Sequence, residues 1–289
     1  MIRGDEIPND RFYDTLHIDE VLSDINSSFT KYFTEFGSDK LHLIHNFKVG
    51  QEKFESDFKK YIELMDRSYL EECEYDPSVF RNILRKDCPI IRRCLNSPEK
   101  VMDAYRKSFN RADSKDMLRV VINLSEYLTK FVETFNPGKQ LDATNPSDLD
   151  VSILDTDEFT CGGVIGGGIR SHFLYNVRPD AFPNRSQFAI WALYFLTNRK
   201  SYGYEDDSEF LMIWRDGRGT QQNYFYQYDL FTYYAIQLFL LLESSSKQLG
   251  YILDHQFRFV YVDTFLNFVS DKHRVDIDIL RPQNEEFHY

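Results

Sequence analysis

The sequence has few of the residues that mark secreted proteins. Only four of its 289 residues are cysteines, and none of them belongs to a Cys-x-x-Cys pair; they are Cys73, Cys88, Cys94 and Cys161. A chain of this length can form a hydrophobic core that is stable without disulfide bonds, so we expect reduced thiols in a cytoplasmic protein. The first ten residues hold no apolar stretch, and we expect no secretory signal there.

Long hydrophobic runs are also missing. The longest apolar run, residues 233–242, is interrupted by Gln237 and has about half the length of a membrane span. It therefore predicts a buried helix, and we expect no membrane partner.

Basic residues are fewer than acidic ones. The 34 Lys and Arg residues against 46 Asp and Glu residues leave a formal charge of −12. Such a charge repels polyanions over most of the surface, so broad, non-specific nucleic-acid binding is disfavoured. Two alternatives stay open: a local basic patch, and an acidic face that imitates nucleic acid toward a protein partner.

The first half of the chain has the periodicity of amphipathic helices. Leu22, Ile25 and Phe29 recur at intervals of three and four residues, which places them on one helical face. Similar stripes continue up to an Asn-Pro-Gly stop at residues 136–138. We expect an N-terminal helical bundle in residues 1–138.

The composition changes after that stop. Residues 139–160 hold six acidic residues and one base, which predicts an exposed acidic connector. Residues 161–289 are rich in aromatics, and we expect them to form a mostly helical domain. Within this domain residues 209–214 suit a short strand and residues 216–219 suit a turn, which together predict one small β-hairpin. The expected fold class is therefore mainly α.

A glycine-rich run is the most informative feature for function. The stretch at residues 162–168 reads Gly-Gly-Val-Ile-Gly-Gly-Gly and leads into a predicted helix. Glycines ahead of a helix leave amide N–H groups that stabilise an anion. We therefore predict a phosphate or anion site at this run, and the alternative is a hinge or tight turn. The candidate ligand-binding residues are Gly166, Gly167, Gly168, Arg170, Ser171, His172 and Arg185. The run matches neither a Walker A loop nor a dinucleotide fingerprint.

One segment resembles a known family. The run Gly-Ile-Arg-Ser-His-Phe-Leu at residues 168–174, followed by Pro179 and by Phe-Pro at 182–183, is similar to the helical lobe of helix-hairpin-helix DNA glycosylases. The resemblance covers about residues 168–195 and extends to segments of uncharacterised bacterial defence proteins; it implies a nucleic-acid-handling ancestry. Asn184 and Arg185 stand where that family carries its catalytic Asp, and its hairpin lysine has no counterpart.

An acidic cluster offers a different chemistry. Asp206, Asp207 and Glu209 precede an apolar run, as carboxylates do in metal-dependent nucleases, where they hold Mg²⁺ and activate a water. A solvated charged loop is the alternative. Histidines with zinc spacing are lacking, so we expect no resident metal, and Mg²⁺ only under the nuclease alternative.

The leading hypothesis is an intracellular binding module that belongs to a larger assembly. It would engage a phosphate-bearing ligand, nucleic acid included, through the glycine-rich run and the nearby Arg and His side chains. The alternatives are a metal-dependent phosphodiesterase and an acidic interaction protein that mimics nucleic acid. No catalytic motif is complete, so a non-enzymatic role is slightly favoured and no cofactor is expected; protein partners are expected.

Overall fold

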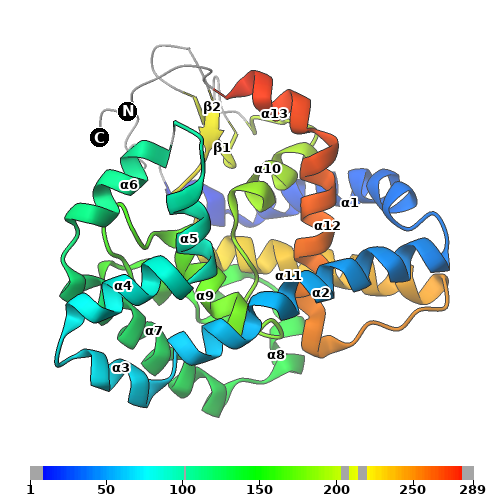
Figure 1. The fold of residues 1–289 in the computed structure, drawn as a ribbon. Coiled ribbons are helices and arrows are strands. Elements are labelled where there is room, and N and C mark those ends of the chain that lie inside the picture. Colours follow the sequence, from blue (N-terminus) through cyan, green and yellow to red (C-terminus); the bar gives the residue numbers. More distant parts are fainter. Residues whose placement is uncertain (1–8, 101, 203–207, 214–219, 282–289) are drawn as a thin grey trace.

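The helical periodicity is realised in the computed structural model, which describes residues 9–100, 102–202, 208–213 and 220–281 (Figure 1). The structure is mainly α, as predicted. The first half of the chain forms η2 (Asn9–Tyr13), α1 (Thr15–Phe36), α2 (Lys40–Leu64), α3 (Arg67–Cys73), α4 (Pro77–Asp87), α5 (Pro89–Asn96), α6 (Met102–Arg111) and α7 (Ser114–Thr134).

The second half continues with short helices and then with long ones. In order they are α8 (Pro137–Leu141), η3 (Pro146–Leu149), η4 (Ser152–Asp155), η5 (Asp157–Phe159), α9 (Gly167–Val177), α10 (Gln187–Leu196), α11 (Tyr228–Gln248), η6 (His255–Phe257), α12 (Arg258–Lys272) and α13 (Arg274–Leu280). Between α10 and α11 the strands β1 (Leu211–Ile213) and β2 (Thr220–Gln222) pair antiparallel, with Leu211 opposite Gln222. The turn expected at residues 216–219 lies outside the described residues.

Aspartate side chains begin the long helices of the first half. Asp14, Asp39 and Asp113 stand at the N-caps of α1, α2 and α7, and each accepts a hydrogen bond from a backbone amide of the first turn. These amides have no partner within the helix, so a carboxylate at this position satisfies them and also matches the helix dipole. Local sequence therefore decides where these helices start.

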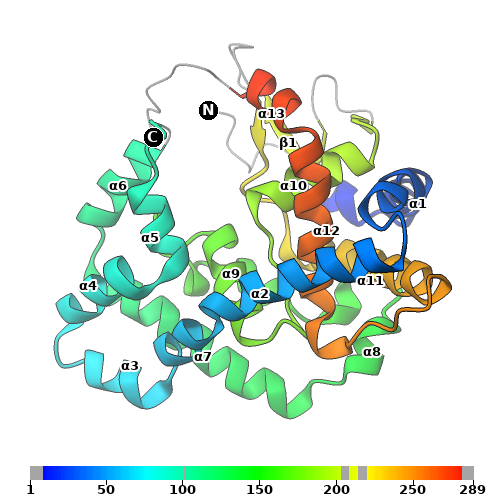
Figure 2. The same ribbon diagram turned by 45° about the vertical axis from the view of Figure 1, so that its right-hand side comes forward.

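The helices form two groups with a space between them. Helices α3 to α7 lie on one side, and α1 with α10 to α13 lie on the other; α2 crosses between the groups and packs on both α12 and α9 (Figures 1 and 2). The buried hydrophobic side chains join in one core that runs from Phe12 to Ile277. This packing crosses residue 138, and the division of the chain into two domains stays a prediction.

The acidic segment 139–160 packs against the core rather than running free over the surface. Its turns of helix bury Leu149, Leu154 and Phe159, and they contact α11 and α7. The acidic side chains between them are mostly exposed; that of Asp155 is 29% exposed and forms an ion pair with Arg170. The segment thereby brings one carboxylate next to α9.

The four cysteines are free. Across the parts of the chain that the structure describes, no helix has the length and apolarity needed to span a bilayer.

Candidate functional site

A cavity of about 1580 Å³ opens between the two groups of helices. Its walls come from α2, α5, α9 and α12, and from the loops before α9, α10 and α11. Gly166, Gly167 and Gly168 line it, and so do His172 and Arg185. The structure thus brings these five predicted residues, together with Arg170, to one concave surface, whereas Ser171 does not line it.

The glycine-rich run makes a tight turn that ends in α9. The amide of Cys161 donates to the carbonyl of Ile165 at 3.0 Å, and Gly163 between them has a φ of +69°, which favours glycine. Gly166 is the N-cap of α9. In the described part of the chain, nothing accepts a hydrogen bond from the amides of Gly166, Gly167 and Gly168, and all three residues line the cavity.

Arg185 reaches the start of α9 from the loop before α10. Its Nη1 donates to the carbonyl of Tyr226 at 2.7 Å and its Nη2 to the carbonyl of Tyr224 at 3.1 Å. A Cβ on Gly167 would lie 1.6 Å from that Nη2, so only glycine leaves room for the guanidinium. The side chain is 5% exposed and its Nε has no hydrogen-bond partner. Burial lowers the pKa of Arg185 to about 10, which keeps it charged at pH 7.

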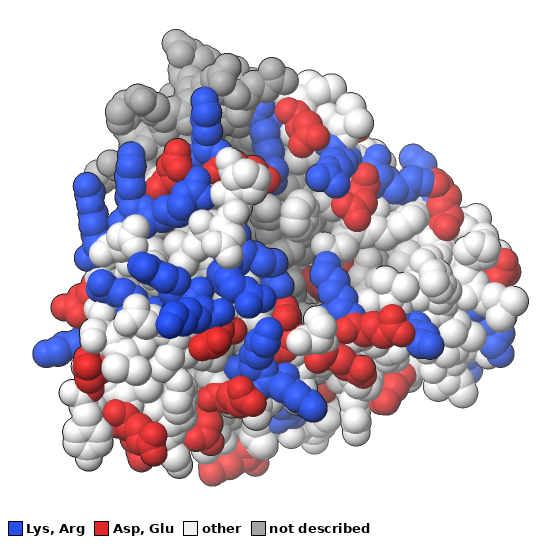
Figure 3. All heavy atoms as spheres, in the orientation of Figure 1, with Lys and Arg blue, Asp and Glu red and all other residues white. Residues whose placement is uncertain are grey.

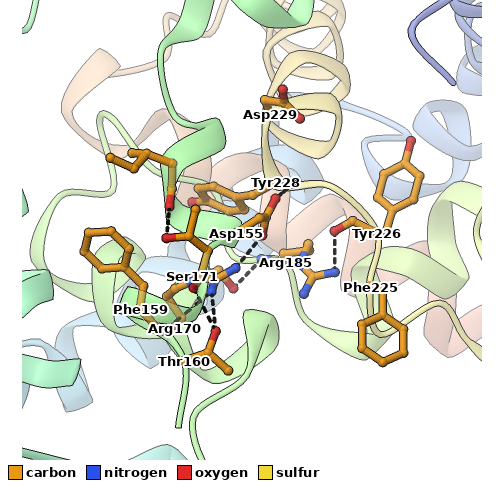
Figure 4. A network of polar contacts seen from close by, with 12 residues as sticks. Asp155, Phe159, Thr160, Arg170, Ser171, Arg185, Phe225, Tyr226, Tyr228 and Asp229 are labelled. Carbon is orange, nitrogen blue, oxygen red and sulfur yellow. Dashed lines mark hydrogen bonds and ion pairs between the residues drawn. The ribbon is translucent and has the colours of Figure 1, made fainter. Parts of the chain in front are cut away.

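Arg170 faces the protein interior. Its Nη2 forms an ion pair with Asp155, and its Nη1 donates to Thr160 Oγ1 at 3.2 Å (Figure 4). The second oxygen of Asp155 accepts the amide of Tyr228 at 2.6 Å, at the start of α11. The guanidinium predicted to bind a ligand is therefore already paired with a carboxylate of the same chain, whose side chain is 29% exposed.

Two buried guanidinium groups lie near this carboxylate, and only one of them is paired with it. Arg170 has the ion pair, whereas Arg185 has only carbonyl oxygens as partners. Arg170, Arg185 and Asp155 together carry one net positive charge, which lies beside the positive end of the α9 dipole. Burial lowers the pKa of Arg170 as well, so charge here is costly in the absence of an anion.

Ser171 holds Arg185 near the first turn of α9. Its hydroxyl donates to the carbonyl of Gly168 at 2.9 Å and accepts the amide of Arg185 at 3.0 Å. It thus ties the loop before α10 to the first turn of α9.

His172 is the residue after Ser171 in α9, and its ring contacts Arg93 of α5. Its Nε2 is 3.2 Å from Arg93 Nη2, and its Nδ1 is 3.3 Å from Asn184 Oδ1. Because arginine only donates, Nε2 accepts and Nδ1–H donates to the amide oxygen. Burial, together with the charge of Arg93, lowers the pKa of His172 to about 4. The imidazole is therefore neutral and lines the cavity as a polar, uncharged group.

A second polar cluster in the cavity was missed from the sequence. Asn184 Nδ2 donates to Asp263 Oδ1 at 2.9 Å, and Asn267 Nδ2 donates to Asp263 Oδ2 at 3.0 Å. Burial raises the pKa of Asp263 to about 6, although Lys53 opposes the shift. The available signal was a pair of polar residues four apart in the apolar run of α12, which places both on one face.

Opposite pH dependences are expected from the two buried groups. The pKa of Asp263 is higher in the folded chain, so its contribution to stability is present near pH 4 and is lost as the pH rises through 6. The pKa of His172 is lower in the folded chain, so its contribution is present above pH 6.5 and is lost toward pH 4. Each shift exceeds two pH units, which corresponds to about 3 kcal/mol.

Urea unfolding of Asp263→Asn and His172→Asn at pH 4, 5.5 and 7 measures this. Relative to wild type, the free energy of unfolding of Asp263→Asn should rise with pH by about 2–3 kcal/mol, and that of His172→Asn should fall by a similar amount. Parallel curves for wild type and both variants would show that neither group is titrated as the burial predicts.

The acidic cluster predicted as a nuclease site does not offer Glu209 to a metal. Its side chain is buried, Oε1 accepts the Tyr226 hydroxyl at 2.5 Å, and Oε2 contacts His17. Asp206 and Asp207 lie outside the described residues. Among the residues that the structure describes, no three His, Cys, Asp or Glu side chains are grouped to hold a metal ion.

Comparison with known proteins returned no matching family model, curated protein or solved structure. The resemblance of residues 168–195 to DNA glycosylases therefore stays a prediction.

Proposed function

We propose that this chain is a binding module that holds a phosphate-bearing ligand in the cavity, with one phosphate at the amides of Gly166, Gly167 and Gly168. The observation that carries the proposal is the pairing of these unbonded amides with Arg185, a buried cation that has no carboxylate of its own. A phosphate at this point accepts the amides and neutralises the net positive charge.

The other predicted residues act at different distances in this proposal. Ser171 positions Arg185. Arg170 is paired with Asp155 and does not touch the ligand, but its positive charge attracts the phosphate. His172 meets the ligand as a neutral hydrogen-bonding group further into the cavity. We place the protein in the cytoplasm as a subunit of a larger assembly, where its four free thiols stay reduced.

Substitution of Gly166 separates binding from folding. Its φ is −98°, which any residue adopts, and a Cβ there meets nothing within 4 Å. Gly166→Leu is expected to keep the free energy of unfolding within about 1 kcal/mol of wild type, because leucine is a poorer N-cap residue than glycine but no side-chain cap hydrogen bond is lost. Its side chain should occupy the phosphate position and weaken binding of pyrophosphate and ATP at least about tenfold, a change of 1.4 kcal/mol.

Isothermal titration calorimetry with pyrophosphate and ATP measures the effect. Gly138→Leu is the matched control, because Gly138 in α8 also has an open Cβ position, with only Asn136 Oδ1 at 3.4 Å, and does not line the cavity. The proposal fails if neither probe binds the wild-type protein, or if Gly166→Leu binds them as wild type does.

A further inference from the structure

The charge of this acidic chain is unevenly distributed. Residues 77–111, which make α4, α5 and α6, contain nine Lys and Arg residues and three Asp and Glu residues. Their net charge is +6 within a chain of −12, so the remainder carries −18. Within this segment, α5 and α6 supply part of the cavity wall.

Most of these cations are available to a ligand. In the described part of the chain six exposed cations of this segment have no ion pair, and one of them, Arg85, donates a hydrogen bond to Asn110. We call the other five the basic surface: Lys86, Arg92, Lys100, Lys107 and Arg111. Figure 3 shows Lys and Arg side chains gathered over α4 to α6, up to the edge of the hollow between the two groups of helices. Acidic side chains collect along the lower edge of the same face.

Arg93 connects this surface with the interior of the cavity. It lies at the end of α5, it is exposed, and its guanidinium contacts both Asp57 and His172. Cations therefore continue from the outer face of α5 to the wall opposite the first turn of α9.

Aromatic rings lie at the other side of the cavity mouth. Phe188, in the first turn of α10, is 40% exposed, and Phe225, in the loop before α11, is 63% exposed. Both line the cavity. Exposed rings beside a run of phosphate-binding cations are the combination that single strands use, since every base has a face that stacks on an aromatic ring.

We propose that the phosphate-bearing ligand is a single strand of nucleic acid that enters the cavity at Gly166–Gly168 and continues over the basic surface, with bases stacked on Phe188 and Phe225. This inference rests on the proposed function, since the strand places one phosphate at the start of α9. A duplex is disfavoured, because its bases stack on each other and leave no face for the two rings. An acidic protein partner would use the cations but not the rings.

The strand is tested by fluorescence anisotropy with a 5′-fluorescein-labelled twelve-nucleotide thymidylate, titrated from 50 to 300 mM KCl. The triple variant Arg92→Gln, Lys100→Gln and Lys107→Gln should bind at least about tenfold more weakly at 50 mM KCl. The slope of log K against log salt should become shallower by about 2, at roughly 0.7 for each lost phosphate contact. Phe225→Ala should weaken binding at least about fivefold, because one stacked base is lost.

A matched control replaces three exposed lysines elsewhere that line no part of the cavity: Lys59→Gln, Lys130→Gln and Lys247→Gln. This variant has the same change in net charge and should bind the strand as wild type does. Equal losses in both triple variants would overturn the inference, because the effect would then come from net charge alone.

Further outcomes separate this inference from the proposed function. Pyrophosphate binding that survives in the basic-surface variant, with loss of strand binding, supports both. Pyrophosphate binding with a strand affinity no higher than that of a single thymidine nucleotide overturns the inference and leaves the proposed function standing. Tighter binding of a duplex, or of a polyglutamate of equal charge, overturns the strand in favour of that ligand. Strand binding that Gly166→Leu leaves unchanged overturns the entry at α9.

Discussion

Gly167→Ala is expected to destabilise the fold and to abolish ligand binding. The new Cβ would lie 1.6 Å from Nη2 and 2.7 Å from Cζ of Arg185, so the guanidinium must move. Moving it breaks the hydrogen bonds to the carbonyls of Tyr224 and Tyr226 and leaves a buried charge without partners. Overpacking of this kind, with lost hydrogen bonds from a charged donor, amounts to about 2–3 kcal/mol of unfolding free energy.

Urea unfolding and calorimetry with pyrophosphate measure the two effects of Gly167→Ala. Gly162→Ala is the control, since a Cβ at Gly162 meets nothing within 4 Å and the residue lies in the same loop. In an Arg185→Met background the cost of Gly167→Ala should shrink, because a flexible uncharged side chain moves aside without breaking hydrogen bonds. A Gly167→Ala protein as stable as wild type would contradict this account of the glycine.

Asp155→Ala is expected to cost about 3 kcal/mol of unfolding free energy, because within the described residues it removes the one carboxylate that is paired with buried Arg170. It also removes the acceptor for the amide of Tyr228 at the start of α11. Three elements that are distant in sequence, η4, α9 and α11, meet at this carboxylate, so its loss should loosen the wall of the cavity.

A double-mutant cycle with Arg170→Met checks this prediction by urea unfolding. The double variant Asp155→Ala, Arg170→Met should recover much of the stability, because no unpaired charge is left buried. Asp103→Ala, which breaks the solvent-exposed pair with Arg106, should change stability far less than Asp155→Ala. Equal effects of Asp155→Ala and Asp103→Ala would show that burial adds nothing to the Arg170 pair.

The helices around the site could be predicted from sequence because their signals are local. The glycine-rich run predicted the helix that is α9. Ser186 is an equally local signal, because its hydroxyl accepts the amide of Ala189 at the start of α10. The apolar pattern from Phe257 to Val262 suits a strand and a buried helix alike, and in the structure residues 258–262 belong to α12.

The basic surface was present in the sequence as a signal, but the net charge of the whole chain conceals it. A charge count over residues 77–111 separates it from the acidic remainder. Where those cations lie is a different matter: only the packing of α5 near α9 puts Arg93 beside His172 and carries positive charge to the cavity.

The roles of the two arginines show the same limit. Arg170 and Arg185 were equal candidates in the sequence, since both lie near the ends of the same two helices. The structure pairs Arg170 with Asp155, fifteen residues earlier, and gives Arg185 only the carbonyls near residue 225. Charge balance at a buried site depends on which groups meet in space, and sequence distance does not reveal that.

The sequence by itself determined the mainly α fold, the start of α9 and the unpaired amides there, because helix periodicity, capping and glycine geometry act over a few residues. Tertiary structure decided that Arg185 lies against those amides and that Arg170 is neutralised. It also placed Asp263 and His172 in one cavity. These contacts join residues up to 79 positions apart, so they follow from how the two groups of helices pack rather than from any local pattern.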